Sequence, residues 1–475
     1  MELIIVLSVL FFVVLTYVDL IQIRNMIGSL DEFQTRSSVK SRIGQLNSSV
    51  DRESDFPCIY VFIPVLRERE AMIQDCLQYF AGMNYPPDKT RIILVTSEKE
   101  IHGLGIVNRR KTTIDFVESA IRKQDGELGV EMFRRVHYPK IQGDKADQLN
   151  HAIYVLSITF PSEDVFLATY DVDSRPDRET LRRVAERYLE SNRNASAFQQ
   201  YSIYLKNYSS LSPIMKCSAI YQTLWTFIYE LPTASGQLDR LTRNQVSNQP
   251  HLARIMGCLK QRLVYCVGHG HFIKSSVLQA VGLYPTNMLA EDLLLGYRLS
   301  LRSIPIEPIW AFDVVDSPAS MMDLIKQAAR WFGGETNIRH IYREAKSANP
   351  SLSGCMTFAY IARLYGIGCW LLGPMVFTFF ILVTTSAKAY ALTTLGLVLG
   401  LLYSGAKFAV FFAMAHRMDA LTKSDFKPKF GESILVIALS PLRCLFNCLG
   451  PIYFVANKLW LLRSKREYEF ERTEK

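Results

Sequence analysis

Long uncharged apolar stretches lie near both ends of the chain. The stretch 3–18 carries no charge, 364–387 has 24 uncharged residues, and 389–406 has another 18. A helix needs roughly 17–25 apolar residues to cross a bilayer. The two C-terminal stretches therefore predict membrane spans. No small-residue cleavage pattern follows the first stretch, so it predicts a retained N-terminal anchor, with a buried core helix as the alternative.

A fourth apolar stretch, 433–457, contains Arg443 and two prolines, Pro441 and Pro451. Its uncharged pieces are 10 and 14 residues long, which suits a re-entrant or interfacial element better than a plain span. Lysines and arginines cluster directly after the first, third and fourth stretches, and the positive-inside rule places such clusters in the cytoplasm. We therefore expect an integral, multi-pass protein of the cell membrane or an endomembrane, with residues 24–356 on the cytoplasmic side.

Between the anchor and the spans, short apolar runs alternate with helical patterns. Four runs predict strands, each followed by a helical pattern: 58–65, 91–97, 133–139 and 164–170. A further apolar run, 264–267, predicts another short strand directly before Gly268. Fully apolar strands that alternate with helices indicate an α/β fold, with a parallel sheet covered on both faces. In such sheets ligands bind beyond the carboxyl ends of the strands.

Acidic residues follow three of the predicted strands. Glu68 comes after the first strand, Glu98 after the second, and Asp171 and Asp173 after the fourth. Two carboxylates spaced i, i+2 at a strand end can bind Mg²⁺ or Mn²⁺, which completes its shell with water and substrate phosphates. Such a pair is common by chance on a solvated surface. Its place at a strand end, opposite other acids, favours a cation site here.

Three more positions carry candidate chemistry. Lys145 lies at an expected helix N-terminus, where its charge and the free backbone N–H groups favour a phosphate. The alternative is a solvated surface lysine, which is the better interpretation of this residue taken alone. His269 lies between Gly268 and Gly270, and either metal or phosphate binding or an ordinary loop role fits it equally. Glu291 and Asp292 begin an apolar helix, so Asp292 is either a helix cap or a general base.

Gln327, Arg330 and Trp331 are spaced i, i+3 and i+4, so they share one face of a predicted helix. An amide, a guanidinium and an indole on one face can bind a pyrophosphate and stack on a sugar ring. Apolar neighbours just ahead of the first large span indicate an amphipathic helix at the membrane surface. The alternative is that Arg330 and Trp331 are ordinary core residues with no role in binding.

Composition narrows the class of protein. The chain has 475 residues, 49% of them apolar, and a formal net charge of +9. That apolar content excludes intrinsic disorder. The basic residues gather at the ends of apolar stretches and form no basic-aromatic module, so we expect no nucleic-acid partner. A transporter is disfavoured because the spans are few and the acids lie outside them.

In this order, the motifs resemble those of the membrane-integrated family 2 glycosyltransferases, which carry a GT-A catalytic domain. The segment IPVLRERE resembles the family's opening strand with its acid, and the K-x-x-x-L-N, DxD, ED and QxxRW elements match residues 145–150, 171–173, 291–292 and 327–331. The same elements occur in cellulose and hyaluronan synthases and in ceramide glucosyltransferases. The sequence departs from the pattern at TSEKE, where the family often has an Asp-Asp or Asp-Gly pair, and at VGHGH, where it has a glycine-cysteine-glycine type of loop.

The resemblance implies a GT-A type, doubly wound, mostly parallel sheet of the nucleotide-diphospho-sugar transferase kind, fused to transmembrane and interfacial helices. It implies an inverting, hexosyltransferase-type enzyme whose donor, a UDP-sugar in the first instance, binds with Mg²⁺ or Mn²⁺ on Asp171 and Asp173. Asp292 is the expected general base. The expected substrate-binding residues are Glu68, Glu98, Lys145, Asp171, His269, Glu291, Gln327, Arg330 and Trp331.

The expected division of the chain is an N-terminal transmembrane anchor (1–23), a cytoplasmic linker (24–56), a GT-A catalytic domain (57–320), an amphipathic interfacial region with QxxRW (321–356), two transmembrane helices (357–416), a cytoplasmic loop (417–431), a broken re-entrant or interfacial segment (432–460) and a charged cytoplasmic tail (461–475).

The expected partners are a nucleotide-sugar donor, a lipid, lipid-linked or polysaccharide acceptor, and membrane lipids. So few spans favour the addition of one or a few sugars in glycolipid biosynthesis. A processive polysaccharide synthase with a homo-oligomer or export partner, and a catalytically silent binding subunit, are the alternatives.

Overall fold

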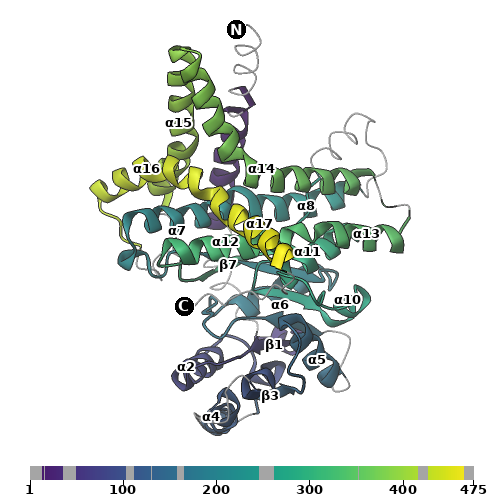
Figure 1. The fold of residues 1–475 in the computed structure, drawn as a ribbon. Coiled ribbons are helices and arrows are strands. Elements are labelled where there is room, and N and C mark those ends of the chain that lie inside the picture. Colours follow the sequence, from purple (N-terminus) through teal and green to yellow (C-terminus); the bar gives the residue numbers. More distant parts are fainter. Residues whose placement is uncertain are drawn as a thin grey trace.

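The computed structural model describes residues 13–14, 16–35, 50–102, 112–129, 131–157, 165–244, 261–350, 352, 354–415 and 426–464. A central sheet is surrounded by helices, and a pair of long helices extends away from the sheet on the side opposite α2 and α4 (Figure 1). The charged tail from residue 465 onward, and most of the predicted anchor, lie outside the described residues.

The sheet has seven strands in the order β3-β2-β1-β4-β6-β5-β7. Its strands are β1 (Cys58–Pro64), β2 (Thr90–Ser97), β3 (Phe133–Tyr138), β4 (Val165–Thr169), β5 (Ala197–Ile203), β6 (His271–Lys274) and β7 (Glu307–Val314). β6 runs antiparallel to β4 and β5, and every other pairing is parallel. This mostly parallel α/β sheet confirms the predicted fold class.

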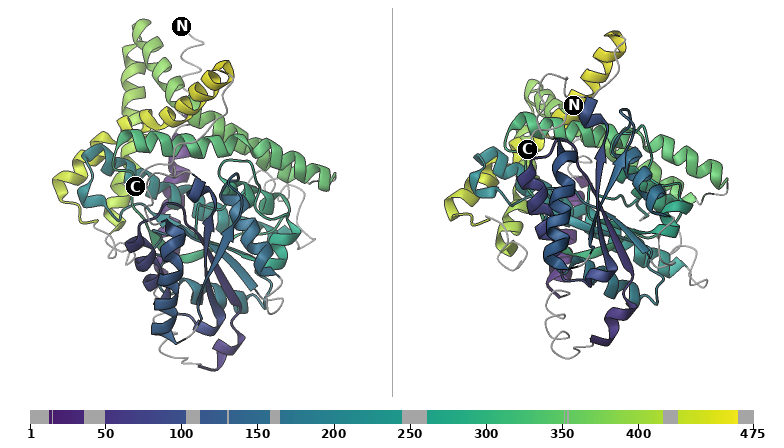
Figure 2. Two further views of the ribbon diagram at one scale, coloured as in Figure 1. Left: turned by 60° about the horizontal axis from the view of Figure 1, so that its bottom comes forward. Right: turned by 90° about the horizontal axis from the view of Figure 1, so that it is seen from below.

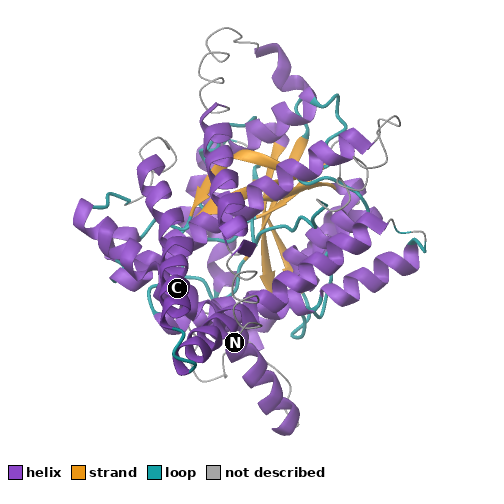
Figure 3. Cartoon of the chain, turned by 90° about the horizontal axis from the view of Figure 1, so that it is seen from above, coloured by secondary structure: helices purple, strands orange, loops and turns teal. Residues whose placement is uncertain are grey.

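Helices cover both faces of the sheet, as Figures 2 and 3 show. Side chains alternate along a strand, so Tyr60 and Phe62 of β1 enter one core while Val61 and Ile63 enter the other. The first core also takes residues from α5 (Lys145–Ser157) and α7 (Pro213–Trp225), and the second from α2 (Glu70–Ala81), α4 (Thr113–Leu128) and α6 (Thr180–Glu190). The remaining helices of this part of the chain are α3 (Lys99–His102), α8 (Leu231–Asn244), α10 (Ser275–Ala280), α11 (Glu291–Leu301), α12 (Met321–Thr336) and α13 (Ile338–Ala348).

The predicted strand at 264–267 is wrong. These residues have no regular structure, and the strand of this region, β6, begins after the glycines, at His271. The backbone N–H groups of Val264 and Val267 instead donate to the side chains of Ser300 and Gln199, at 2.9 and 3.0 Å. Polar side chains thus accept the backbone hydrogen bonds that a neighbouring strand would otherwise accept.

The N-terminal helix, residues 16–35, packs against the first core and β7. Met26, Leu30 and Phe33 are buried in the first core, and the ring of Phe33 lies 4.7 Å from that of Phe312 on β7. The sequence predicted a polar linker from residue 24 onward. The three apolar residues have helical spacing, but the segment around them is mainly polar, so the buried face of this helix was not recognised.

Three helical segments are long and apolar enough to cross a membrane: Gly354–Ser386, Tyr390–Ala415 and Phe430–Trp460. The first two are α14 and α15. The third joins α16 (Phe430–Leu445), a 3₁₀ turn (Phe446–Cys448) and α17 (Leu449–Ser464), with Pro441 inside α16. Length and composition make membrane association plausible, whereas the number of crossings stays a prediction.

The apolar helices pack against the α/β part of the chain rather than being joined to it only by a linker. Phe408 and Phe411 of α15 and Val436 of α16 belong to the first core. α17 lies across α12, as its yellow ribbon shows in Figure 1. A Cβ at Gly450 of α17 would lie 2.4 Å from the Cβ of Ala328, so the two helices pack too closely there for any side chain.

We therefore expect Gly450→Ala to lower the free energy of unfolding by about 1–3 kcal/mol, because the added methyl overpacks the α12–α17 contact. The measurement is the melting temperature of the purified protein in detergent. Gly431→Ala in the first turn of α16 is the matched control, since a Cβ at Gly431 would have nothing within 4 Å. Equal melting temperatures for the two variants would contradict this packing.

Candidate active site

The sheet brings the GHGH segment beside the DVD motif. β4 ends at Thr169, and because β6 is antiparallel, it begins at the edge where β4 ends, with Thr169 opposite His271. The backbone N–H of Gly270 donates to the Thr169 carbonyl at 2.8 Å. Gly270 has φ +72, and a Cβ there would lie 3.0 Å from the Cβ of Gln200. Glycine is therefore required for this turn to reach the strand end.

Lys145 begins α5, as the sequence predicted, and its helix is capped by a reciprocal pair. The Asp144 carboxylate accepts from the backbone N–H of Asp147, and the Asp147 carboxylate accepts from that of Asp144, both at 2.9 Å. The capped turn directs Lys145 towards the strand ends. Its ammonium lies 3.0 Å from Oδ1 of Asp171 and 3.8 Å from Oε1 of Glu291.

This lysine stays charged. Burial would lower the pKa of Lys145, but the carboxylates of Asp171, Glu291 and Asp292 outweigh burial and hold it above its ordinary value. The ammonium also lies 3.4 Å from the carbonyl oxygen of Gly268. A single cation thus joins the DVD motif, the ED motif and the GHGH segment.

The ED motif lies at the start of α11, after a residue in an unusual conformation. Ala290 has φ +57, in the left-handed region that a non-glycine residue rarely adopts. Asp292 is 8% exposed, and burial raises the pKa of its carboxyl. Burial, followed by the Asp292 charge, raises the pKa of Glu291 to about 7. Gly268 lies over Asp292, since a Cβ there would be 3.6 Å from Asp292 Oδ2.

His269 pairs with a buried acid that sequence reasoning missed. Its Nδ1 lies 3.3 Å from Oδ2 of Asp313, a fully buried residue of β7. Burial raises the pKa of Asp313, the neighbouring His269 opposes that shift, and Asp173 adds to it. Asp313 lies within β7, directly after the apolar residues 309–312, and has no motif around it, so only the three-dimensional pairing reveals it.

Asp171 and Asp173 fit a hard divalent cation by the chemistry of their donors. The Asp171 carboxylate is 41% exposed, so a ligand can reach it beside Lys145. Within the described residues, no three His, Cys, Asp or Glu side chains come together as a metal cage. A cation here would therefore take one or two protein carboxylates and complete its shell with phosphate and water, as Mg²⁺ and Mn²⁺ do.

Glu68 and Glu98 lie at the ends of β1 and β2, but no hydrogen bond or ion pair joins either to Lys145. The backbone N–H of Glu68 donates to Oγ1 of Thr113 at 3.0 Å. The Glu98 carboxylate lies 3.1 Å from Nε2 of His137 on β3. Glu98 is thus held at the outer edge of the sheet, and its nucleoside-binding role stays a prediction.

The QxxRW residues lie on α12, as predicted, and two of them contact the catalytic part of the chain. Gln327 Oε1 accepts from Gln222 Nε2 at 2.8 Å. The Trp331 ring packs edge-on against Tyr204, 6.5 Å between centroids. Arg330 is exposed, and no described residue forms an ion pair with it. The C-terminal half of α12 lies against the ED motif, because a Cβ at Gly334 would lie 2.5 Å from Ala290.

An aromatic and acidic cluster lies beside these residues and was not predicted. Trp225 stacks on Tyr229 with 4.7 Å between ring centroids, and its indole N–H donates to the Tyr265 hydroxyl at 2.9 Å. That hydroxyl donates to Glu230 at 2.9 Å. Thr226–Glu230 form a π-helical turn between α7 and α8, and such turns often mark functional sites.

Arg363, in the first candidate span, joins this cluster to the apolar helices. Its guanidinium forms an ion pair with the buried Glu335 of α12, Nε to Oε2 at 3.0 Å. It also lies over the rings of Tyr229, Tyr265 and Tyr297, 5.2–5.7 Å from their centroids. A single charged residue in an otherwise apolar stretch was the available signal, since such residues are usually paired and often functional.

Comparison with known proteins agrees with the resemblance to family 2 glycosyltransferases. Residues 219–404 match the model of Glycosyl transferase family group 2, a range that includes the ED and QxxRW elements. This match confirms the predicted family 2 resemblance. A probable glycosyltransferase of Sulfolobus acidocaldarius is 22% identical over 295 residues, which cover 62% of this chain and 53% of that protein. The chain thus spans about half the length of this curated relative.

Solved structures give weaker likenesses. The mannosyltransferase PcManGT from Pyrobaculum calidifontis, in complex with GDP-Man and Mn²⁺, is 14% identical, with 86% of this chain and 99% of that chain covered and a TM-score of 0.43. Residues 1–349 of S. aureus TarS with UDP-GlcNAc are 11% identical, with 87% and 94% covered and a TM-score of 0.37. Because both TM-scores are below 0.5, neither likeness defines the function of this chain.

The Glu230 carboxyl predicts a pH dependence of stability. Burial raises its pKa from 4.5 to about 7. The folded chain therefore keeps a proton that the unfolded chain loses, and up to about 3 kcal/mol of stability, fully present below pH 4.5, is lost as pH rises through 7. Glu230→Gln, a neutral isostere, removes this titration. Its melting temperature in detergent should fall less than that of the wild type between pH 5 and 8, and a pH-independent difference would contradict the assignment.

Proposed function

We propose that the protein is an inverting glycosyltransferase that moves a sugar from a nucleotide-diphosphate sugar to a lipid, lipid-linked or glycan acceptor at the cytoplasmic membrane face. The observation that carries this proposal is the Lys145 ammonium, which lies 3.0 Å from Asp171 and 3.8 Å from Glu291. This positive charge lies between the DVD and ED motifs, where the diphosphate of a donor would bind. The match of residues 219–404 to the family 2 model supports the same reaction class.

The donor diphosphate would bind at the strand ends, beside Lys145. The Lys145 ammonium offers positive charge to the phosphates. Asp171 and Asp173 would hold Mg²⁺ or Mn²⁺, which neutralises the charge that develops on the leaving diphosphate. Glu68 and Glu98 would contact the nucleoside from the ends of β1 and β2. A UDP-sugar is the first donor to test.

Asp292 would act as the general base. An acceptor hydroxyl attacks the anomeric carbon, the bond from that carbon to the diphosphate oxygen breaks, and the hydroxyl proton passes to the Asp292 carboxylate. One displacement from the opposite face inverts the anomeric configuration. Burial raises the pKa of Asp292, which makes its carboxylate a better proton acceptor. Burial raises the pKa of the neighbouring Glu291 to about 7, and this side chain lies 3.8 Å from the Lys145 ammonium.

The acceptor would approach along α12. Gln327 and Trp331 would line this side, and their contacts with Gln222 and Tyr204 support that placement. Arg330 is exposed, and therefore available to a phosphate of the donor or of a lipid-linked acceptor. His269, held by Asp313, would contact the donor sugar or the diphosphate.

A processive polysaccharide synthase is the second candidate, because the motif set is shared with such enzymes. The small number of apolar helices favours single addition, since export needs a channel. Product length separates the two: purified enzyme with a radiolabelled donor should give one short product, whereas a ladder or polymer would establish processive synthesis.

Asp292→Asn should reduce transfer roughly 10²–10⁴-fold, because the amide cannot accept the proton. Donor binding should change little, since Lys145 and the DVD motif are intact. Turnover is followed as nucleoside diphosphate release and donor binding by calorimetry. Asp75→Asn, an exposed acid on α2, is the control and should keep full activity. Unchanged turnover in the Asp292 variant would rule out this base.

Asp173→Asn should raise the Mn²⁺ concentration needed for half-maximal transfer, because one of the two carboxylate ligands is lost. Asp316→Asn serves as the control, since Asp316 is half exposed and pairs with Lys206 at 3.4 Å on the surface. Activity that needs no divalent cation, or an unchanged Mn²⁺ requirement in the Asp173 variant, would overturn the metal assignment.

A further inference from the structure

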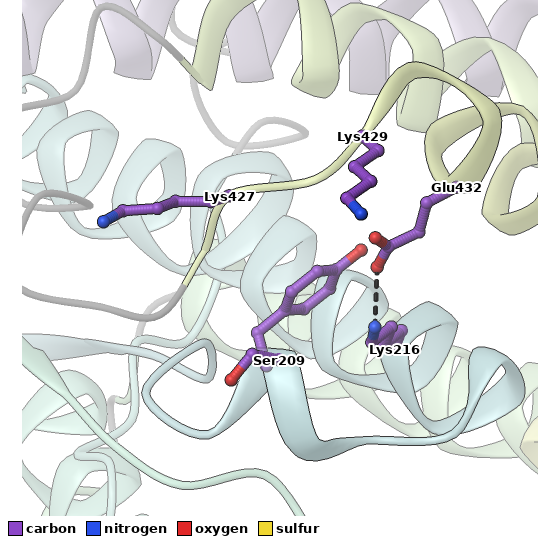
Figure 4. A pocket seen from close by; sticks show the side chains of 6 residues that line it. Ser209, Lys216, Lys427, Lys429 and Glu432 are labelled. Carbon is purple, nitrogen blue, oxygen red and sulfur yellow. Dashed lines mark ion pairs between the residues drawn. The ribbon is translucent and has the colours of Figure 1, made fainter.

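A cavity of about 340 Å³ lies where the catalytic part of the chain meets the third candidate span. It is lined by Tyr208, Ser209, Lys216, Lys427, Lys429 and Glu432 (Figure 4). None of these residues belongs to the candidate active site. The volume lies in the range of small-molecule binding sites. The residues that line the cavity are mostly charged or polar, whereas the helices of the neighbouring candidate spans are apolar.

The cavity carries an excess of positive charge. Lys216 of α7 forms an ion pair with Glu432 at 2.8 Å and lies 5.2 Å from the centre of the Tyr208 ring. Glu432 therefore neutralises one lysine, while Lys427 and Lys429 have no ion-pair partner among the described residues. Lys429 points towards Glu432, and Lys427 extends outwards along the rim (Figure 4).

Two further kinds of hydrogen-bond donor lie beside these lysines: the first backbone N–H groups of α16 and the Tyr208 hydroxyl. α16 begins at Phe430, directly after Lys429, and the first backbone N–H groups of a helix carry partial positive charge and have no partner within the helix. Tyr208 is buried, and its hydroxyl lies beside the Glu432 carboxylate at the cavity wall. Burial and the nearby Glu432 carboxylate raise the pKa of Tyr208 above its ordinary value, so the hydroxyl keeps its proton and can donate it.

An apolar face begins at the edge of this cavity. Phe430 is 83% exposed, and Ile434, Leu435, Leu442 and Leu445 of α16 are also exposed. The spacing from Phe430 to Ile434, Leu442 and Leu445 keeps these side chains on one side of the helix. Lysines at the end of an exposed apolar helix lie at the depth of lipid headgroups, where anionic lipids attract them.

We propose that this cavity binds the phosphate of an anionic phospholipid headgroup, with the acyl chains along the apolar face of α16. Lys429, Lys216 and the Tyr208 hydroxyl contact the phosphate oxygens, the N-terminal N–H groups of α16 add to them, and Lys427 attracts the headgroup from the rim. This inference concerns membrane docking and does not depend on the transfer reaction.

The test measures lipid binding by the purified full-length protein in a neutral detergent. Short-chain phosphatidylglycerol should raise the melting temperature with saturable dependence on concentration. Lys427→Gln/Lys429→Gln should weaken the apparent affinity about 10- to 30-fold, because each lysine near a lipid surface contributes to binding. Tyr208→Phe, which removes only the hydroxyl, should weaken it by a smaller factor. The matched control, Lys140→Gln/Lys346→Gln, removes two exposed lysines elsewhere and should bind as the wild type does.

Three outcomes would overturn the proposal. The first is an equal shift from short-chain phosphatidylcholine, which shows that charge is not recognised. The second is an equal loss of affinity in the control double variant, which shows only a net-charge effect. The third is an equal stabilisation by inorganic phosphate at the same concentration, which assigns the cavity to a free anion rather than to a lipid.

Discussion

The interaction on which the candidate active site depends is the ammonium of Lys145 among three carboxylates. Asp171, Glu291 and Asp292 come from segments more than 100 residues apart, and their negative charges would repel one another without a cation. Burial alone would lower the pKa of Lys145, yet these carboxylates keep the pKa above its ordinary value. The lysine thus offsets the repulsion among the carboxylates of the DVD and ED motifs.

The fold provides this arrangement by reversing one strand. β4 ends at the same sheet edge as β1 and β2, as parallel strands do. Antiparallel β6 starts at that edge, and so Gly268 and His269 reach the DVD motif from the opposite direction. Close packing between α11 and the loop at Cys266 then fixes the position of the ED motif, which begins α11. A Cβ at Gly296 of α11 would lie 2.2 Å from the backbone nitrogen of Cys266, so helix and loop are in direct backbone contact.

Sequence periodicity predicted the four parallel βα units and the start of α5 because fully buried strands are apolar throughout and helices show a 3.6-residue repeat. It failed for Val264–Val267, where Val264 and Cys266 are buried but the N–H groups of Val264 and Val267 bond to the side chains of Ser300 and Gln199 instead of to a strand. It also missed Asp313. Burial of an isolated acid depends on a partner, His269, more than 40 positions away in the sequence, and no local pattern records such a pairing.

The central claim is that this charged cluster binds and activates a nucleotide sugar. The most direct measurement is nucleoside diphosphate release from a panel of nucleotide sugars, with and without Mn²⁺, by the wild type and by Lys145→Met. We predict Mn²⁺-dependent release from one donor class by the wild type, and a loss of release in a variant that remains folded by its melting temperature. Release from no donor, or equal release by the variant, would contradict the claim.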